Sequence, residues 1–240
     1  MQLNSAKSLT IAKMKNLRIA PLFLSIMFMC VFFTSARSQD KQEEKIVAAT
    51  KVLQDFSKMK ESIPTELLKV TQGIIVVPKL INAGFVLAGK RGKGIAMVKL
   101  ENGNWSNPVF VTITGGSVGF QAGVQSVDLV LICKSAGTLQ NIGNGSFTLG
   151  GDISVTAGPV GRNSTASTDY KLEAEVYSYS RSKGLFAGIS LAGSAISIDS
   201  KANESFYGND DDAGTLFSNA TLNTSAPVKE MKSTLKEMYQ

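Results

Sequence analysis

Between residues 40 and 61, apolar side chains recur every three or four positions, as they do in an amphipathic helix. Pro64 ends the pattern, because the residue before a proline avoids helical geometry. The pattern predicts a helix over residues 40–61 and a second, short helix over 65–71. When successive residues are placed 100° apart around a helix axis, the apolar side chains fall within an arc of roughly 140° and form one face. They are Ile46, Ala49, Val52, Leu53, Phe56, Met59 and Ile63.

From Gly73 onward the pattern changes to short runs rich in β-branched and aromatic residues, which glycines interrupt. Turn signals at residues 102–104, 144–145 and 183–184 separate several of them. The pattern predicts a β-rich α+β fold, with a curved antiparallel sheet or barrel-like domain and flanking N- and C-terminal amphipathic helices. The expected strands span residues 74–77, 84–88, 95–100, 109–114, 117–124, 129–133, 146–149, 153–156, 170–179 and 185–198.

The last third of the chain contains fewer strand-like runs. One helical segment is expected over residues 135–142, and residues 208–226 are polar and resemble a loop. The pattern over residues 227–239 predicts a short C-terminal amphipathic helix, because four apolar side chains would share one face of it. These are Val228, Met231, Leu235 and Met238.

The N-terminus has the pattern of a targeting segment. Lys13, Lys15 and Arg18 precede an uncharged apolar stretch, and small residues at Ala36 and Ser38 suit a cut before residue 39. The apolar centre is short for a membrane span, so we expect a cleaved signal peptide rather than an uncleaved anchor helix. The predicted organisation is a signal peptide at residues 1–38 and one domain at 39–240. This predicts an exported protein of the periplasm or cell envelope, or a secreted one.

Charge supports this division. The chain carries 25 Lys and Arg against 19 Asp and Glu, a net charge of +6. Residues 1–38 hold five of the bases and no acid, so residues 39–240 carry 20 bases and 19 acids, or +1. The basic character therefore reports the export signal more than a ligand, and a nucleic-acid interaction loses its support.

The absence of histidine excludes Ser-His-Asp and Cys-His catalysis and His-ligated zinc or haem. Of the two cysteines, Cys30 lies in the leader and Cys133 in an apolar run, so we expect no disulfide, no metal centre and no cofactor. We therefore expect a protein that is not an enzyme. A hydrolase that uses Ser117 with a lysine stays open as a remote alternative.

Three short motifs resemble catalytic or metal sites but lack essential parts. Residues 84–91 approach a P-loop, yet Arg91 stands where that loop needs Ser or Thr, so a glycine-rich hairpin is expected. Residues 115–119 match the G-x-S-x-G elbow, whose serine needs a histidine base. Residues 210–212 are three aspartates without the spaced ligands of a calcium loop.

A basic cluster stands out from this background. Lys90, Arg91 and Lys93 fall within four residues on an expected turn, and Arg181 and Lys183 lie near a second turn. Cations near anionic lipid each contribute on the order of 1 kcal/mol to binding. The cluster is equally consistent with a solvated hairpin tip.

A set of ordered motifs lies between about residues 49 and 208. The most specific are Ala157-Gly158-Pro159-Val160-Gly161-Arg162 and the stretch from Tyr177 to Gly188 that begins Tyr-Ser-Tyr-Ser-Arg-Ser-Lys-Gly. The other motifs are residues 63–64, 67–68, 73–78, 83–85, 92–94, 105–108, 115–123, 149–152 and 203–208. Together these motifs resemble the SYLF domain family.

The resemblance implies a non-enzymatic, β-rich, lipid-binding domain that recognises phosphoinositides or other anionic phospholipids at an envelope membrane surface. The chain resembles the exported bacterial members of the family. In fungi the module is also described as actin-binding, but we do not expect actin as a partner of an exported bacterial protein. The expected lipid contacts are Lys90, Arg91, Lys93, Arg181 and Lys183. Docking or insertion of the first helix through Ile46, Val52, Leu53, Phe56 and Met59 is a further hypothesis, although its balanced charge favours packing on its own domain. The alternative is a structural or protein-interaction module without lipid affinity.

Overall fold

The computed structural model describes residues 39–59, 63–84, 87–118, 123–140, 142, 145–159, 172–183, 185–186 and 189–239. The chain divides into two compact units, Met1–Lys41 and Gln42–Gln240. The expected signal peptide, residues 1–38, lies outside the described part. The sheet and the helices discussed here belong to the second unit.

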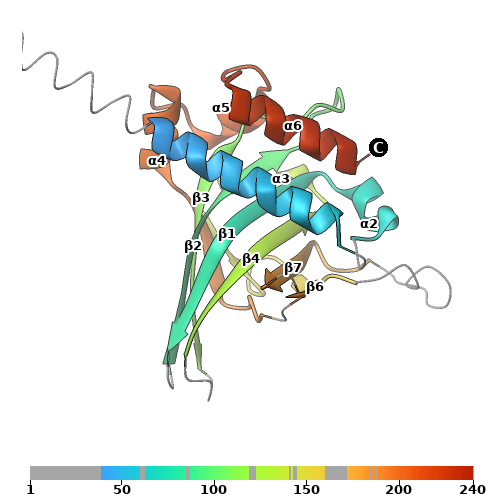
Figure 1. The fold of residues 1–240 in the computed structure, drawn as a ribbon, viewed down its shortest axis with the longest axis vertical. Helices are drawn as coiled ribbons and strands as arrows, with labels where there is room; N and C mark the ends of the chain where they lie inside the picture. Colours follow the sequence, from blue (N-terminus) through green and yellow to red (C-terminus); the bar gives the residue numbers. More distant parts are fainter. Residues whose placement is uncertain are drawn as a thin grey trace, which may run out of the picture. The chain divides into compact units, whose positions relative to one another are not determined.

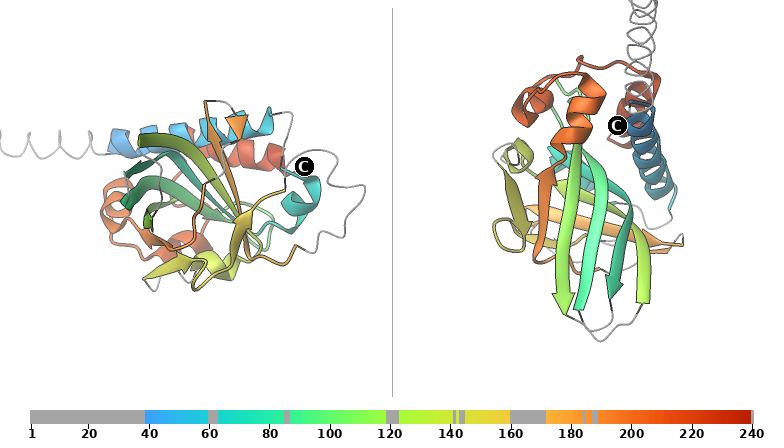
Figure 2. Two further views of the ribbon diagram at one scale, coloured as in Figure 1. Left: turned by 90° about the horizontal axis from the view of Figure 1, so that it is seen from below. Right: turned by 90° about the vertical axis from the view of Figure 1, so that its left-hand side faces the viewer.

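A nine-stranded sheet forms the centre of this unit, in the order β5-β9-β3-β2-β1-β4-β7-β6, with β8 paired to β7. All its strand pairs are antiparallel except β6 with β7. The sheet curls until it is nearly closed (Figures 1 and 2), which confirms the predicted β-rich, barrel-like class. The strands are β1 (Gly73–Gly84), β2 (Leu87–Val98), β3 (Val109–Val118), β4 (Gly123–Cys133), β5 (Ser146–Leu149), β6 (Val155–Ala157), β7 (Val176–Ser182), β8 (Leu185–Phe186) and β9 (Ser194–Ile198).

The four central strands are longer than the sequence pattern predicts. Residues 74–77 and 84 belong to one strand, β1, whose pairing with β4 shifts register between Val77 and Leu80. Lys79 adopts a positive φ of 53° at this shift. Pro78 and Lys79 interrupt the apolar pattern, but the sheet accommodates them as a bulge, so the strand continues.

Both faces of the sheet are buried along much of its length, because successive residues of a strand point to opposite sides. On one face, here called the outer face, Ile74 and Val76 pack against helical residues 42–57, α4 (Ser200–Tyr207) and α6 (Ala226–Met238). On the other, the inner face, Ile75 and Val77 join a second core with α3 (Ala136–Gln140) and α5 (Ala213–Ser218).

Several predicted helices are confirmed. Residues 42–57 are helical, α2 spans Thr65–Val70 and α3 lies within the expected segment. α6 buries Val228, Met231 and Leu235, and Met238 packs partly buried against the same core. Within the described residues, no helix combines the length and the apolar character needed to cross a membrane.

Two predictions near the C-terminus are wrong. The expected strand over residues 185–198 is two short strands, β8 and β9, and the expected loop over 208–226 contains α5. The helix α4 was not predicted. The side chain of Asp199 accepts a hydrogen bond from the Ala202 N–H, and that of Asp212 from the Thr215 N–H. These N-caps stabilise helices whose apolar patterns are too short to recognise.

Candidate functional site

The basic cluster lies within a strand, not on a turn. Lys90, Arg91 and Lys93 belong to β2, and the β1–β2 connection comes earlier, between Gly84 and Leu87. The turn assignment is therefore wrong. Ile95 and Met97 of the same strand pack in the outer core, so alternation places Lys93 and Arg91 on the outer face and Lys90 on the inner face.

Lys90 is buried, with only 5% of its surface exposed. Its ammonium donates a hydrogen bond to the carbonyl oxygen of Ser190. Burial lowers the pKa of Lys90, because desolvation penalises the charged form. Lys90 therefore does not present a charge to an external head group in this structure.

Lys93 pairs with Asp199 at 2.6 Å between Nζ and Oδ2. Burial of Asp199 would raise its pKa, but the hydrogen bond and charge of Lys93 and the Ala202 N–H outweigh burial and hold the pKa below its usual value. The Lys93 side chain is 49% exposed, so the pair contributes little to stability by itself. Lys93 joins β2 to the first turn of α4, and its charge is compensated.

Arg181, in β7, links three elements. Its Nη2 lies 2.9 Å from the carboxylates of both Asp55 and Asp128, and its guanidinium carbon lies 5.6 Å from the centre of the Phe56 ring. Burial would lower the pKa of Arg181, but hydrogen bonds to Asp128 and Asp55 outweigh burial and raise it. With 14% of its side chain exposed, Arg181 connects the 42–57 helix to the sheet.

Of the five predicted cations, Arg91 and Lys183 are exposed without an ion pair to any described residue. Arg91 stands opposite Ile81 of β1 and Thr114 of β3. Lys183 follows Ser182, whose hydroxyl donates to the Ser126 carbonyl of β4. The structure therefore separates the predicted cluster into one buried lysine, two paired cations and two exposed ones.

The apolar side chains proposed to face a membrane lie in the outer core. Ile46 and Leu53 are 0% exposed, Phe56 1% and Val52 4%, and Met59 packs partly buried against them. Insertion through this face would require the 42–57 helix to leave the sheet. Packing on its own domain, the arrangement that balanced charge favours, is the one observed.

The glycine-rich motifs have ordinary structural roles. Gly84 pairs with Ala88 across the β1–β2 hairpin, which confirms the hairpin predicted for the P-loop-like segment. Ser117 lies in β3, opposite Ala88, and β3 continues to Val118. A nucleophile elbow instead needs a strand, a tight turn at the serine and a following helix.

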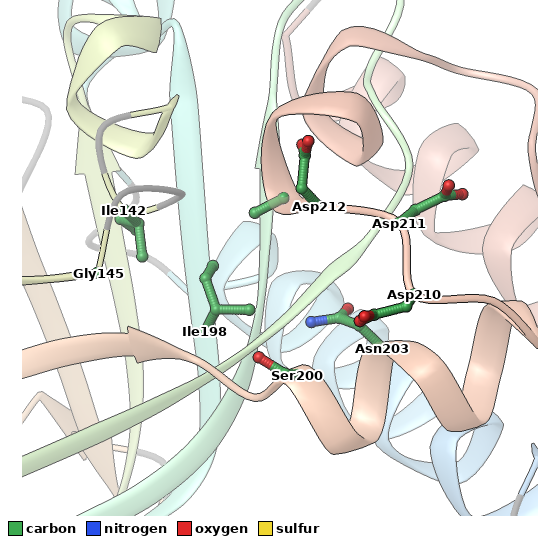
Figure 3. A pocket seen from close by; sticks show the side chains of 9 residues that line it. Ile142, Gly145, Ile198, Ser200, Asn203, Asp210, Asp211 and Asp212 are labelled. Atoms are coloured by element: carbon green, nitrogen blue, oxygen red, sulfur yellow. The ribbon is translucent and has the colours of Figure 1, made fainter.

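A pocket of about 360 Å³ lies beside the acidic residues 210–212. The side chains of Asp210, Asp211 and Asp212 point in different directions rather than toward one point (Figure 3). Asp212 caps α5, and the Asn203 amide is bonded to the backbone of Phe110 and Asp199. Among the described residues no group of three or more Asp, Glu, Cys or His could hold a metal ion.

Sequence reasoning missed the acidic partners Asp55, Asp128 and Asp199, because each meets its cation through long-range contacts. It also missed Ile81 and Val124, which are 41% and 77% exposed on the outer face of the sheet. The position of Lys90 could have been predicted from the sequence. If a strand includes Lys90 and Arg91, their side chains must point to opposite faces of the sheet.

Comparison with known proteins gives a consistent family match. Residues 114–238 match the family described as "Ysc84: Las17-binding protein actin regulator". The chain is 34% identical over 187 residues to "LAS seventeen-binding protein 3" of Saccharomyces cerevisiae, covering 77% of this chain and 40% of that protein. It is 34% identical over 179 residues to "SH3 domain-containing YSC84-like protein 1" of Xenopus laevis, covering 74% of this chain and 53% of that protein.

"Protein YSC84" of Saccharomyces cerevisiae is 37% identical over 169 residues, which is 67% of this chain and 36% of that protein. The chain thus spans between about one third and one half of the length of these relatives. The family match, residues 114–238, includes β4 to β9 and α3 to α6, whereas β1 and β2 precede it.

Proposed function

The chain belongs to the Ysc84 (SYLF) family, and from this membership we propose that it is a non-enzymatic binding module that associates with anionic phospholipid surfaces. The observation that supports the proposal is Arg91. It is an exposed cation on the outer face of the sheet, without an acidic partner among the described residues, whereas Lys93 and Arg181 on the same face are neutralised. An uncompensated cation is free to meet a phosphate.

Co-sedimentation with vesicles tests the proposal. Residues 39–240 should bind vesicles that contain phosphatidic acid, cardiolipin or phosphoinositide and should bind pure phosphatidylcholine much less. Raising the salt concentration should weaken binding, because exposed charges are screened. Absence of binding to every anionic vesicle at low salt would refute lipid association.

A protein partner is the second candidate. One relative is named "LAS seventeen-binding protein 3", and the family description names Las17 binding and actin regulation. We do not carry actin binding over to this chain, which we propose to be exported. Co-sedimentation with filamentous actin discriminates between the candidates, since the lipid-binding proposal expects the protein to stay in the supernatant.

Export is itself a proposal that rests on residues 1–38. Five bases, no acid and an apolar stretch that ends in small residues support a signal peptide. N-terminal sequencing of the protein from the envelope or medium should begin at Gln39. A protein that is found inside the cell and still begins at Met1 would contradict export by cleavage.

A further inference from the structure

The ends of β1, β2, β3 and β4 project beyond the helices (Figures 1 and 2). Residues that pair across neighbouring strands point to the same face of a sheet. At these strand ends, the residues of the outer face therefore lie in two rows that cross all four strands. We call these rows the end face. The first row is Ser126, Ile81, Arg91 and Thr114, and the second is Val124, Ala83, Gly89 and Gly116.

The end face exposes aliphatic side chains where the same strands are elsewhere covered. Val124 is 77% exposed and Ile81 41%, whereas Val130 of β4 and Ile95 of β2, farther along the same face, are 0% exposed. A side-chain carbon built on Gly89 would have no atom within 4 Å. The surface is therefore open above Gly89.

Charge on this surface has one sign. Arg91 is the charged member of the two rows, and the rows contain no carboxylate. Two acids on the same face, Asp128 and Asp199, are bound to Arg181 and Lys93. An exposed valine and isoleucine beside one uncompensated guanidinium match the boundary between phosphates and acyl chains of an anionic bilayer.

We infer that the end face is the membrane contact, with Arg91 on lipid phosphates and Val124 and Ile81 in the apolar boundary beneath them. This inference rests on the proposed lipid association and adds its location. It directs the projecting strand ends toward the bilayer and leaves the 42–57 helix packed on the sheet. A symmetrical contact between two copies fits less well, because it would bring two uncompensated Arg91 side chains together.

The test compares Arg91→Gln and Val124→Ser with matched control variants on the helices. It uses the purified protein and vesicles of phosphatidylcholine mixed with phosphatidic acid, an anionic lipid. Lys229→Gln removes an exposed cation of α6, and Val47→Ser removes a valine that is 49% exposed on the 42–57 helix. All proteins share one N-terminus, so any binding by residues 1–38 is common to them.

Arg91→Gln should weaken binding about fivefold at low salt and less at high salt. Val124→Ser should weaken it roughly three- to tenfold at both salt concentrations, because its contribution is apolar. Neither control should change binding. Unfolding temperatures should stay near that of the parent, since all four positions are exposed.

Two outcomes overturn the inference while lipid association stands. In one, the parent binds but the end-face variants bind like the controls. In the other, the variants change only the oligomeric state in size-exclusion chromatography. If the parent binds no anionic vesicle at all, the proposed function fails as well.

Discussion

Lys90 lies on the inner face of β2, where burial lowers the pKa of its ammonium. An unfolded lysine has a pKa of about 10.4. At pH values between the native pKa and this value, the unfolded chain therefore holds more bound protons than the folded one. The free energy of unfolding then rises with pH across the window between the two values. The same burial that removes Lys90 from an external lipid contact makes it a titrating group of the core.

Substitution Lys90→Met should abolish this alkaline gain. Urea unfolding at pH 7 and pH 10 measures the free energy of unfolding of both proteins. That of the parent should rise relative to that of the variant as the pH rises. Lys201→Met, at an exposed position of α4, is the control and should show no such difference. A parent–variant difference that is equal at both pH values would contradict the lowered pKa.

Arg181 holds two carboxylates that come from different elements. Its replacement by leucine should lower the free energy of unfolding by about 2 kcal/mol, because Asp55 and Asp128 then repel each other in partly buried positions. The cost stays below that of a deeply buried pair, since the carboxylate side chains are 33% and 24% exposed.

The double change Asp55→Asn with Asp128→Asn in the Arg181→Leu background should recover part of the loss, as measured by chemical denaturation. Recovery identifies the loss as unpaired charge rather than lost packing on Phe56. If the triple variant is as unstable as Arg181→Leu alone, Arg181 stabilises the fold through the packing of its aliphatic stem and not through its ion pairs.

At the scale of the element, glycines let β2 lie close against β1 at some positions and leave it open at others. A side-chain carbon on Gly94 would lie 2.4 Å from the Val76 carbonyl oxygen, which is backbone and cannot rotate away. On Gly89, in the same strand, it would meet nothing within 4 Å. One strand thus contains a position that requires glycine and one that tolerates alanine.

We expect Gly94→Ala to lower the free energy of unfolding by about 2 kcal/mol or more, the usual cost of overpacking. Gly89→Ala should be neutral or slightly stabilising, because alanine restricts the unfolded chain more than glycine does. Thermal unfolding of the two variants side by side measures the difference. Equal effects would show that the register of β1 and β2 differs from the one described.

Local pattern predicted the elements that are long and strongly periodic. The 42–57 helix and α6 follow from apolar periodicity, and β5 from a β-branched and aromatic run. The pattern did not predict that residues 74–84 form one strand, because a bulge at Lys79 is stabilised by neighbouring strands and by the Asp128 carboxylate, which accepts from the Lys79 N–H. Local sequence does not encode such long-range support.

The candidate site shows the same division. The sequence located the basic cluster, but the environments of its members depend on which face of β2 each occupies and on acids far along the chain. Asp199 is 106 positions from Lys93, and Asp55 is 126 from Arg181. The end face depends on register between four strands, so Val124 and Ile81 had no common signal in the sequence.

Across the whole second unit, helices cover one part of the outer face and leave the strand ends bare. The 42–57 helix contributes five nearly inaccessible side chains to the outer core, namely Ile46, Ala49, Val52, Leu53 and Phe56. Insertion of this helix in a bilayer would uncover Ile74, Val76 and Met97 of the sheet to water. Each fully buried side chain of this kind contributes roughly 1.5–3 kcal/mol, so detachment opposes membrane binding, whereas contact through the end face leaves the core intact.

Hydrogen exchange with and without anionic vesicles distinguishes these two modes of binding. If the end face makes the contact, backbone amides of residues 46–56 should keep their protection on vesicles, and amides of β4 near Val124 should gain protection. If the helix inserts, the amides of β1 and β2 beneath it should lose protection, because their side chains lose their cover. Phe56→Leu provides a second comparison. If the end face makes the contact, this variant should have a lower unfolding temperature, because Phe56 packs in the core, but an unchanged affinity for vesicles. If the helix inserts, the variant should bind vesicles more weakly.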